Sequence, residues 1–175
     1  MHVIMPPRWR KFALMAHVTT SVGWMGAIAA FLALGIIGVT TENAQVARGA
    51  YLVMEPAAWW VLVPFAIASL FTGIVISLGT TWGLFRHYWV LFKLAINVFA
   101  TVVLLEYMQT FRHMAAVAAD PSATLDSVRN PSPILHAVLA LLLLLVATVL
   151  AIYKPRGVTA YGRRKLLQHR TVAQP

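Results

Sequence analysis

Four long apolar runs constrain this chain more than any other feature of its sequence. Each reaches or exceeds the roughly 20 residues that an α-helix needs to cross a hydrocarbon core about 30 Å thick. The chain is also 60% hydrophobic and only 11% charged, which is more apolar surface than a soluble domain can bury. We therefore predict an all-α fold, a four-transmembrane-helix bundle within residues 1–155, with spans at Trp9 to Val39, Tyr51 to Trp82, Trp89 to Met108 and Ile134 to Tyr153.

The basic residues are unevenly distributed between the connections. Ten of the 14 Lys and Arg residues fall at the N-terminus, at Arg86 between the second and third runs, and in the tail. By the positive-inside rule, both the N and C termini are predicted to be cytoplasmic, and residues 156–175 form a basic, partly disordered cytoplasmic tail. The formal net charge of +9 is then mainly a topology signal. We expect anionic lipids at the cytoplasmic face as partners, and no nucleic acid.

Lys93 lies inside the third apolar run. A Lys at the centre of a spanning helix costs about 2.5 to 3.5 kcal/mol on insertion scales, so it marks a candidate functional site. At helical spacing Lys93 shares a stripe with Asn97 and Tyr107, whereas Glu106 falls on nearly the opposite face. Two interpretations stay open: an interaction within the bundle, or an ammonium that reaches the headgroups beside Arg86.

His17 is predicted to lie at the same depth as Lys93. Six residues separate Lys11 from His17 and seven separate Arg86 from Lys93, which places both side chains roughly 10 Å above the inner basic edge. Ser77 and Thr148 come out at similar heights, so each span contributes to an inner polar layer. His17 is either hydrogen-bonded to a neighbouring helix or a ligand. The ridge of Ser69, Gly73 and Ser77 either packs helices together or makes room for a flat ligand.

A second polar zone is predicted at the outer side. His136, Glu106, His113 and Glu55 belong to it, and a divalent metal bound by some of them is one alternative to solvated side chains. His136 and His17 differ in height by roughly 18 Å, too far for both to ligate one haem iron. The second span is expected to begin near Glu55-Pro56 and to kink at Pro64. The loop of residues 115–133 is expected to hold a short helix ended by prolines.

Several segments resemble known families. The run HVTTSVGWMGAIAAFLAL, the segment LGTTWGLFRHYWVLFKL and the ending IYKPRGVTAYG resemble a bacterial, notably actinobacterial, family of small four-span integral membrane proteins of unknown function. The pattern His17-x6-Trp24-x-Gly26, with Trp89-x3-Lys93-Leu94, is similar over two short segments to the HemJ-type protoporphyrinogen oxidases. It is more loosely similar to the CopD copper-resistance membrane domain.

The resemblance to HemJ implies roles for two residues. His17 would be a haem-associated histidine, and Lys93 a cation that contacts the cofactor or porphyrin. The chain lacks the Pro-Arg stretch that follows the first span in HemJ-type enzymes, and it has Tyr107 where relatives tend to place a histidine late in the third span. A pairing of Tyr107 with His136 is an alternative at that place. The bacterial likeness implies a multi-pass protein of the bacterial cytoplasmic (inner) membrane.

Two functions follow from the sequence. The first is a haem- or porphyrin-binding membrane protein, a candidate oxidoreductase, with haem b as cofactor held by His17, Trp24, Lys93 and Asn97. The second is a non-enzymatic small transporter, metal-handling protein or accessory subunit, in which the inner polar layer only holds helices together. A transporter of this length would work as a homodimer.

Overall fold

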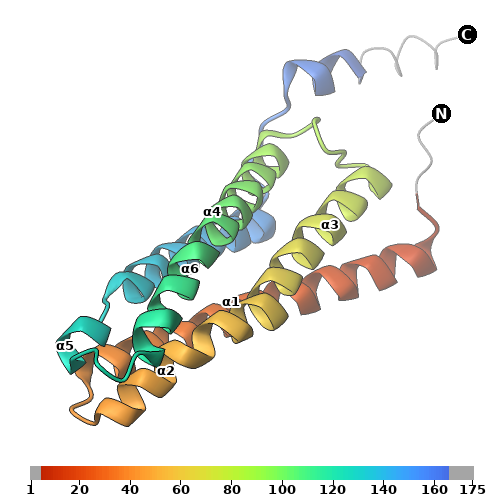
Figure 1. Cartoon of the computed structure of the whole chain (residues 1–175). Helices are drawn as coiled ribbons and strands as arrows, with labels where there is room; N and C mark the ends of the chain where they lie inside the picture. Colours follow the sequence, from red (N-terminus) through yellow and green to blue (C-terminus); the bar gives the residue numbers. More distant parts are fainter. Residues whose placement is uncertain (1–4, 166–175) are drawn as a thin grey trace, which may run out of the picture.

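Four long helical stretches form the bundle that the apolar runs predict (Figure 1). The structure is a computed structural model and describes residues 5–165. The first stretch is α1 (Pro7–Thr40); the second combines α2 (Ala44–Ala57), the π-helical η1 (Ala58–Leu62) and α3 (Val63–Gly79). The third is α4 (Tyr88–Ala119), and the fourth is α6 (Ser132–Tyr153), which the short α5 (Leu125–Val128) precedes. Each stretch is long and apolar enough to cross a membrane, which confirms the predicted four-span fold and indicates a membrane protein.

The predicted start of the second span near Glu55-Pro56 is wrong, because the span begins earlier in the structure. Asn43 caps α2, because its side-chain oxygen accepts hydrogen bonds from the backbone N–H groups of Gln45 and Val46. The helix therefore starts at Ala44, and Pro56 lies inside it instead of in its first turn.

The irregularity expected at Pro64 takes the form of a π-helical turn just before it. The N–H of Val63 donates to the carbonyl of Ala58, five residues back, instead of four. In a regular α-helix the ring of Pro64 would clash with the carbonyl of residue 60. The wider turn relieves that clash while the span continues as α3.

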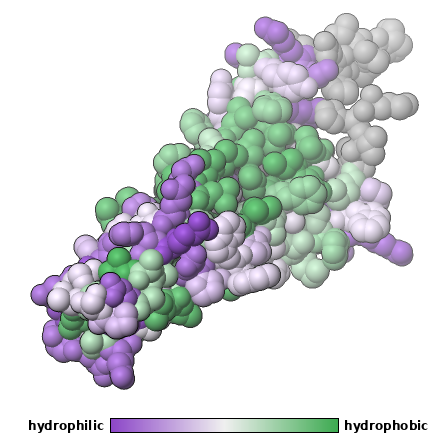
Figure 2. Space-filling view, in the orientation of Figure 1, coloured by the Kyte–Doolittle hydropathy of each residue, from purple (hydrophilic) through white to green (hydrophobic). Residues whose placement is uncertain are grey.

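The two ends of the bundle differ in charge. We call the end formed by Pro7, Gly79, Tyr88 and Tyr153 the basic end, and the opposite end, beside the short helix, the α5 end. Both ends of the described chain lie at the basic end. All five acidic residues of the chain lie at the α5 end or in the half of a helix nearer to it: Glu42, Glu55, Glu106, Asp120 and Asp126. Figure 2 shows hydrophilic residues over the α5 end and an apolar surface over the middle of the same face.

The hydrophobic core occupies the half of the bundle nearer the α5 end. Its largest members include Trp24, Tyr51, Met54, Phe31 and Phe111, and the last two meet edge to face with ring centroids 5.4 Å apart. In the basic half, stretches of all four spans contain no fully buried side chain. We call these stretches the open layer: residues 14–23, 70–79, 91–99 and 148–153. Figure 1 shows α3 and α4 diverging toward this end.

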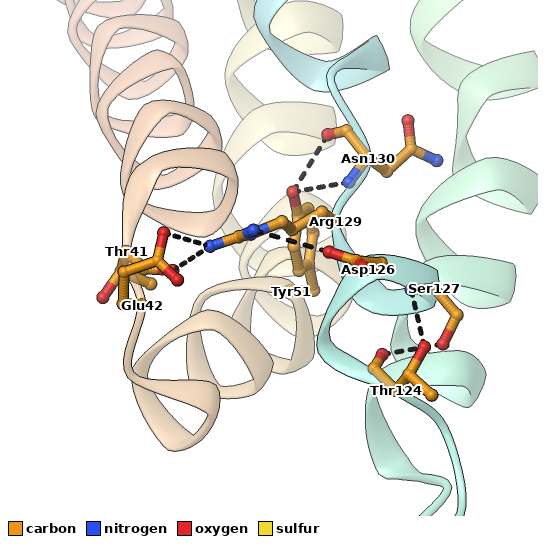
Figure 3. A network of polar contacts seen from close by, with 8 residues as sticks. All are labelled: Thr41, Glu42, Tyr51, Thr124, Asp126, Ser127, Arg129 and Asn130. Carbon is orange, nitrogen blue, oxygen red and sulfur yellow. Dashed lines mark hydrogen bonds and ion pairs between the residues drawn. The ribbon is translucent and has the colours of Figure 1, made fainter.

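Hydrogen bonds from side chains to backbone close the α5 end (Figure 3). The buried hydroxyl of Tyr51 donates to the carbonyl of Asn130 at 3.0 Å and accepts from its N–H at 2.9 Å. Arg129 donates to the carbonyl of Thr41 and forms ion pairs with Glu42 and Asp126. The loop that carries α5 is thereby fixed to the turn between α1 and α2.

Arg48 makes a second fixed point for the same loop. Its guanidinium donates to the carbonyls of Ala118, Asp120 and Ala123. The hydroxyl and N–H of Ser122 donate to the Asp120 carboxylate and hold the pKa of that carboxyl below its usual range. At pH values above the ordinary pKa of an aspartate, these bonds stabilise the folded loop. That contribution is lost as the pH falls through the lowered pKa of Asp120. The predicted short helix before the prolines is confirmed as α5.

Part of the predicted basic tail is folded against the loop between α3 and α4. The N–H of Thr159 donates to the carbonyl of Arg86 at 2.9 Å, its hydroxyl donates to that of Phe85 at 2.6 Å, and the N–H of Tyr88 donates to the carbonyl of Gly157 at 3.3 Å. Residues 160–165 are helical. The rest of the predicted tail, residues 166–175, lies outside the described residues.

Candidate functional site

His17 contacts α3 from its position in the middle of the open layer. Its ring packs on Gly73, where an added Cβ would come within 3.1 Å of the imidazole Cε1. Gly73, one of the three small residues of the predicted ridge, therefore accommodates the histidine between α1 and α3. Beside it, the imidazole Nδ1 lies 3.1 Å from the hydroxyl of Thr72.

The hydrogen bonds of Thr72 indicate which ring nitrogen of His17 carries the proton. The Thr72 hydroxyl has one hydrogen, and its shortest contact is with the carbonyl of Ala68 at 2.6 Å, to which it donates. Its oxygen is then free to accept, so Nδ1 of His17 carries the proton and donates. In this neutral tautomer Nε2 has an unprotonated lone pair, which is the form in which histidine binds metals.

A polar seam continues along the contact between α1 and α3. Ser21 and Ser69 share a hydrogen bond of 2.8 Å between their hydroxyls, and Thr20 approaches Thr72 at 3.5 Å. Sequence reasoning identified Ser69 and His17 but missed Thr72. Thr72 could have been identified by comparing the polar residues that are expected at equal depth on the first and second spans.

Lys93 lies one turn from the aromatic side chain of Trp89 and stacks over it, with Nζ 5.8 Å from the ring centroid. The ammonium is half-buried and belongs to the same open layer as His17. The five acidic residues all lie toward the other end of the bundle. In the described part of the chain, Lys93 forms no ion pair.

The remaining members of the predicted inner layer do not connect the helices. The side chain of Asn97 donates to the carbonyl of Lys93, Ser77 donates to Gly73, and Thr148 donates to Leu144, each within its own helix. Trp24 is 2% exposed and belongs to the hydrophobic core, so it borders the open layer without being accessible from it. The structure thus brings His17 together with α3 and places Lys93 in the same open layer.

The predicted outer metal set is not assembled into one site. Glu55 pairs with Arg112 at 3.5 Å and borders a surface cavity of about 610 Å³ with Pro56, Trp59 and Trp60. Glu106 and His113 are exposed on α4. Among residues 5–165, no group of three or more His, Cys, Asp or Glu side chains is arranged to hold a metal ion.

His136 and Tyr107 form a pair by direct stacking. Their ring centroids are 4.0 Å apart with an interplanar angle of 29°. The Tyr107 hydroxyl donates to Ser132 at 2.8 Å, and Nδ1 of His136 lies 2.9 Å from the carbonyl of the same serine. Rings in van der Waals contact leave no space between them for an iron or a porphyrin.

Among the described residues, Nε2 of His17 has no hydrogen-bond partner and the Lys93 ammonium has no ion pair, and both lie in a half of the bundle without carboxylates. This combination favours a ligand that offers a metal or a hydrogen-bond donor to the imidazole and a negative charge to the lysine. No protein-family model, no curated protein and no solved structure matches the chain.

Proposed function

We propose that this chain is an integral membrane protein that binds haem b or a related porphyrin in the open layer. The observation that carries the proposal is the 3.1 Å contact between Nδ1 of His17 and the Thr72 hydroxyl, which itself donates to Ala68; from it we infer that Nδ1 carries the proton and that Nε2 is available. Metal-binding histidines commonly donate their second ring N–H to a fixed acceptor in this way, which orients the ring.

The other residues of the site suit such a ligand. His17 would provide the axial nitrogen, and Lys93 would pair with a propionate, which supplies the negative charge that this half of the bundle lacks. A bound haem would supply one-electron redox chemistry, whose potential depends on its axial ligand. Asn97 keeps its amide oxygen free to accept a hydrogen bond, because only its nitrogen donates to Lys93.

Packing supports the same location. Residues 70–79 of α3 and 91–99 of α4 contain no buried side chain, although both segments lie within spans of the bundle. Helices at this depth can accept a planar ligand without the removal of close-packed core residues, whose loss would cost several kcal/mol each.

The absorption spectrum of protein purified from haem-replete cells tests the proposal. We expect a Soret band that His17→Ala removes and that Lys93→Met weakens. Thr72→Val should lower haem affinity by about 10- to 100-fold, the usual effect of losing the group that orients a metal-binding histidine. The matched controls are Thr19→Val and Lys11→Met, which change exposed side chains of α1. A wild-type protein with no Soret band, and no spectral response to added haemin, would contradict the proposal.

A non-enzymatic accessory role is the second candidate. The observation that favours it is the seam of hydrogen bonds between α1 and α3, in which Ser21–Ser69 and His17–Thr72 join two helices directly. Such bonds contribute about 0.6 kcal/mol each on average in membranes. On this candidate, His17→Ala and Ser21→Ala lower thermal stability by similar amounts, and neither changes any spectrum.

The cellular setting is part of the same proposal. The basic end would face the cytoplasm of a bacterial cell, as the positive-inside rule predicts, and anionic lipids would gather around its Lys and Arg side chains.

A homodimer is the proposed assembly, since a four-span chain is short for a complete membrane site. Native mass spectrometry of the detergent-solubilised protein distinguishes a dimer from a monomer.

A further inference from the structure

The loop between α3 and α4, residues 80–87, contains enclosed polar atoms without partners. Nε and Nη2 of the Arg86 guanidinium are both shielded from solvent and lack a hydrogen-bond partner among residues 5–165. The hydroxyl oxygen of Thr80, at the start of the same loop, is in the same state. Leaving buried donors unpaired is costly, and in native proteins such groups commonly indicate a missing ion or water.

The loop holds the Arg86 side chain in one position. Gly83 has a φ of 62°, and its N–H donates to the carbonyl of Thr80 in a tight turn. The aliphatic part of Arg86 lies directly over Gly83, where an added Cβ would come within 2.9 Å of Arg86 Cδ. On the other side of the guanidinium, Nη1 donates to the carbonyl of Thr81 at 3.3 Å.

The folded part of the tail fixes the backbone of Arg86. The carbonyl of Arg86 accepts the N–H of Thr159, and Gly162 passes so close that an added Cβ would meet the same carbonyl oxygen. The side chain of Arg86 is therefore held by its own loop, and the backbone that carries it is held by a segment far away in the sequence. A donor group fixed in advance loses little conformational freedom when it binds a ligand.

The unpartnered face has the geometry of an anion receptor. Nε–H and the outer Nη2–H of a guanidinium point in the same direction and bind two oxygens of a carboxylate or phosphate together. Arg129 also has an enclosed Nε without a partner, but its terminal nitrogens pair with Glu42 and Asp126. Arg86 forms no ion pair among the described residues.

We propose that Arg86, with Thr80, forms a binding site for a single phosphate group at the basic end of the bundle. The phosphate oxygens would take the two donors of Arg86, and the Thr80 hydroxyl would donate to a third oxygen. Because these atoms are enclosed, phosphate binding at this site would require the side chains around them to move aside.

The position of the loop favours a phospholipid headgroup over free phosphate. The loop joins the ends of two spans, and Trp82, Phe85 and Tyr88 around it are 39%, 55% and 49% exposed. Exposed aromatic side chains at the end of a span are typical of the headgroup region, where lipid phosphates lie. The site is separate from His17 and does not depend on porphyrin binding. It also differs from diffuse attraction of lipids to basic residues, which any cation at this end would provide.

Native mass spectrometry of the full chain in a neutral detergent tests the site. We titrate phosphatidylglycerol, phosphatidylcholine and inorganic phosphate in separate experiments, with wild type, Arg86→Gln, Arg86→Lys, Thr80→Val and the control Arg156→Gln. The control removes one positive charge from an exposed residue at the same end. We expect one high-affinity lipid per chain, weakened about tenfold or more by Arg86→Gln, as for loss of charge-assisted hydrogen bonds. Arg156→Gln should have little effect.

The separate titrations distinguish a phospholipid headgroup from free phosphate as the ligand. Tighter binding of phosphatidylglycerol or phosphatidylcholine than of inorganic phosphate supports a lipid, and equal or tighter binding of inorganic phosphate supports the free ion at the same site. Arg86→Lys keeps the positive charge but loses the paired N–H donors. It therefore tests the proposed site even if Arg86→Gln is unstable. Equal losses in Arg86→Gln and Arg156→Gln, full affinity in Arg86→Lys, or no phosphate-dependent binding in wild type would overturn the proposal.

Discussion

At the scale of single residues, polar side chains in these apolar spans find partners in two ways. Ser77, Thr148 and Asn97 bond to the carbonyl four residues earlier in their own helix, whereas His17 bonds across to Thr72. Counting residues from the basic edge gives an expected depth for each group, because rise per residue is fixed. It could not predict the partner, because that depends on how each helix is rotated about its axis, and Thr72 lies one residue from the Ser69–Gly73–Ser77 ridge.

Glycines in α1 give a matched test of packing at single residues. An added Cβ at Gly38 would lie 2.8 Å from Cζ of Tyr51, whereas one at Gly26 would meet nothing within 4 Å. Overpacking costs about 1 to 3 kcal/mol, more than the roughly 0.5 to 1 kcal/mol that alanine gains over glycine in a helix. Gly38→Ala should therefore lower the thermal unfolding midpoint in detergent, and Gly26→Ala should keep or raise it. Equal midpoints for the two variants would show that Tyr51 is not held as described.

At the scale of elements, hydrophobicity and length predicted the four spans but not all their limits. The start of the second span was misplaced because its first turns, from Ala44, are less apolar than the run that follows, and Asn43 caps them. The folded part of the tail was missed for a different reason. It is held mainly by backbone carbonyls of Phe85, Arg86 and Gly157, and such contacts leave no pattern of side chains in the sequence.

The contact between tail and loop has its own test. An added Cβ at Gly162 would lie 2.5 Å from the carbonyl oxygen of Arg86, but one at Gly157 would lie at an ordinary 3.4 Å from Tyr88. Gly162→Ala should detach the tail, so the amide hydrogens of Tyr88 and Thr159 should exchange about tenfold or more faster. Hydrogen exchange followed by mass spectrometry measures this, with Gly157→Ala as the control. Unchanged exchange in Gly162→Ala would contradict the contact.

At the scale of the whole molecule, the separation of charge between the two ends was readable in the sequence. All the acidic residues lie toward the α5 end, and the basic end carries most of the Lys and Arg residues. What the sequence did not predict is the unequal packing, with a dense core beside α5 and an open layer beyond Trp24. Apolar residues occur in both halves, and which of them become buried depends on the spacing and rotation of the helices, which composition does not reveal.

The proposed orientation can be tested on the intact molecule. The chain has no cysteine, so single cysteines can be placed at exposed Ser122 near α5 and at exposed Arg156 at the basic end. In intact bacterial spheroplasts, a membrane-impermeant maleimide should label Ser122→Cys, whereas Arg156→Cys should react only after lysis. The reverse labelling pattern would place the basic end outside.

The folded part of the tail also sets an order of events during synthesis. Thr159 follows Phe85 by 74 residues, and α4, α5 and α6 all lie between them. The loop at residues 80–87 therefore leaves the ribosome long before its partner exists, and its carbonyls must stay solvated until the last span has been inserted. Attachment of the tail is then one of the final steps of maturation, and a chain released before Thr159 could complete all four spans while its Arg86 loop remained unsecured.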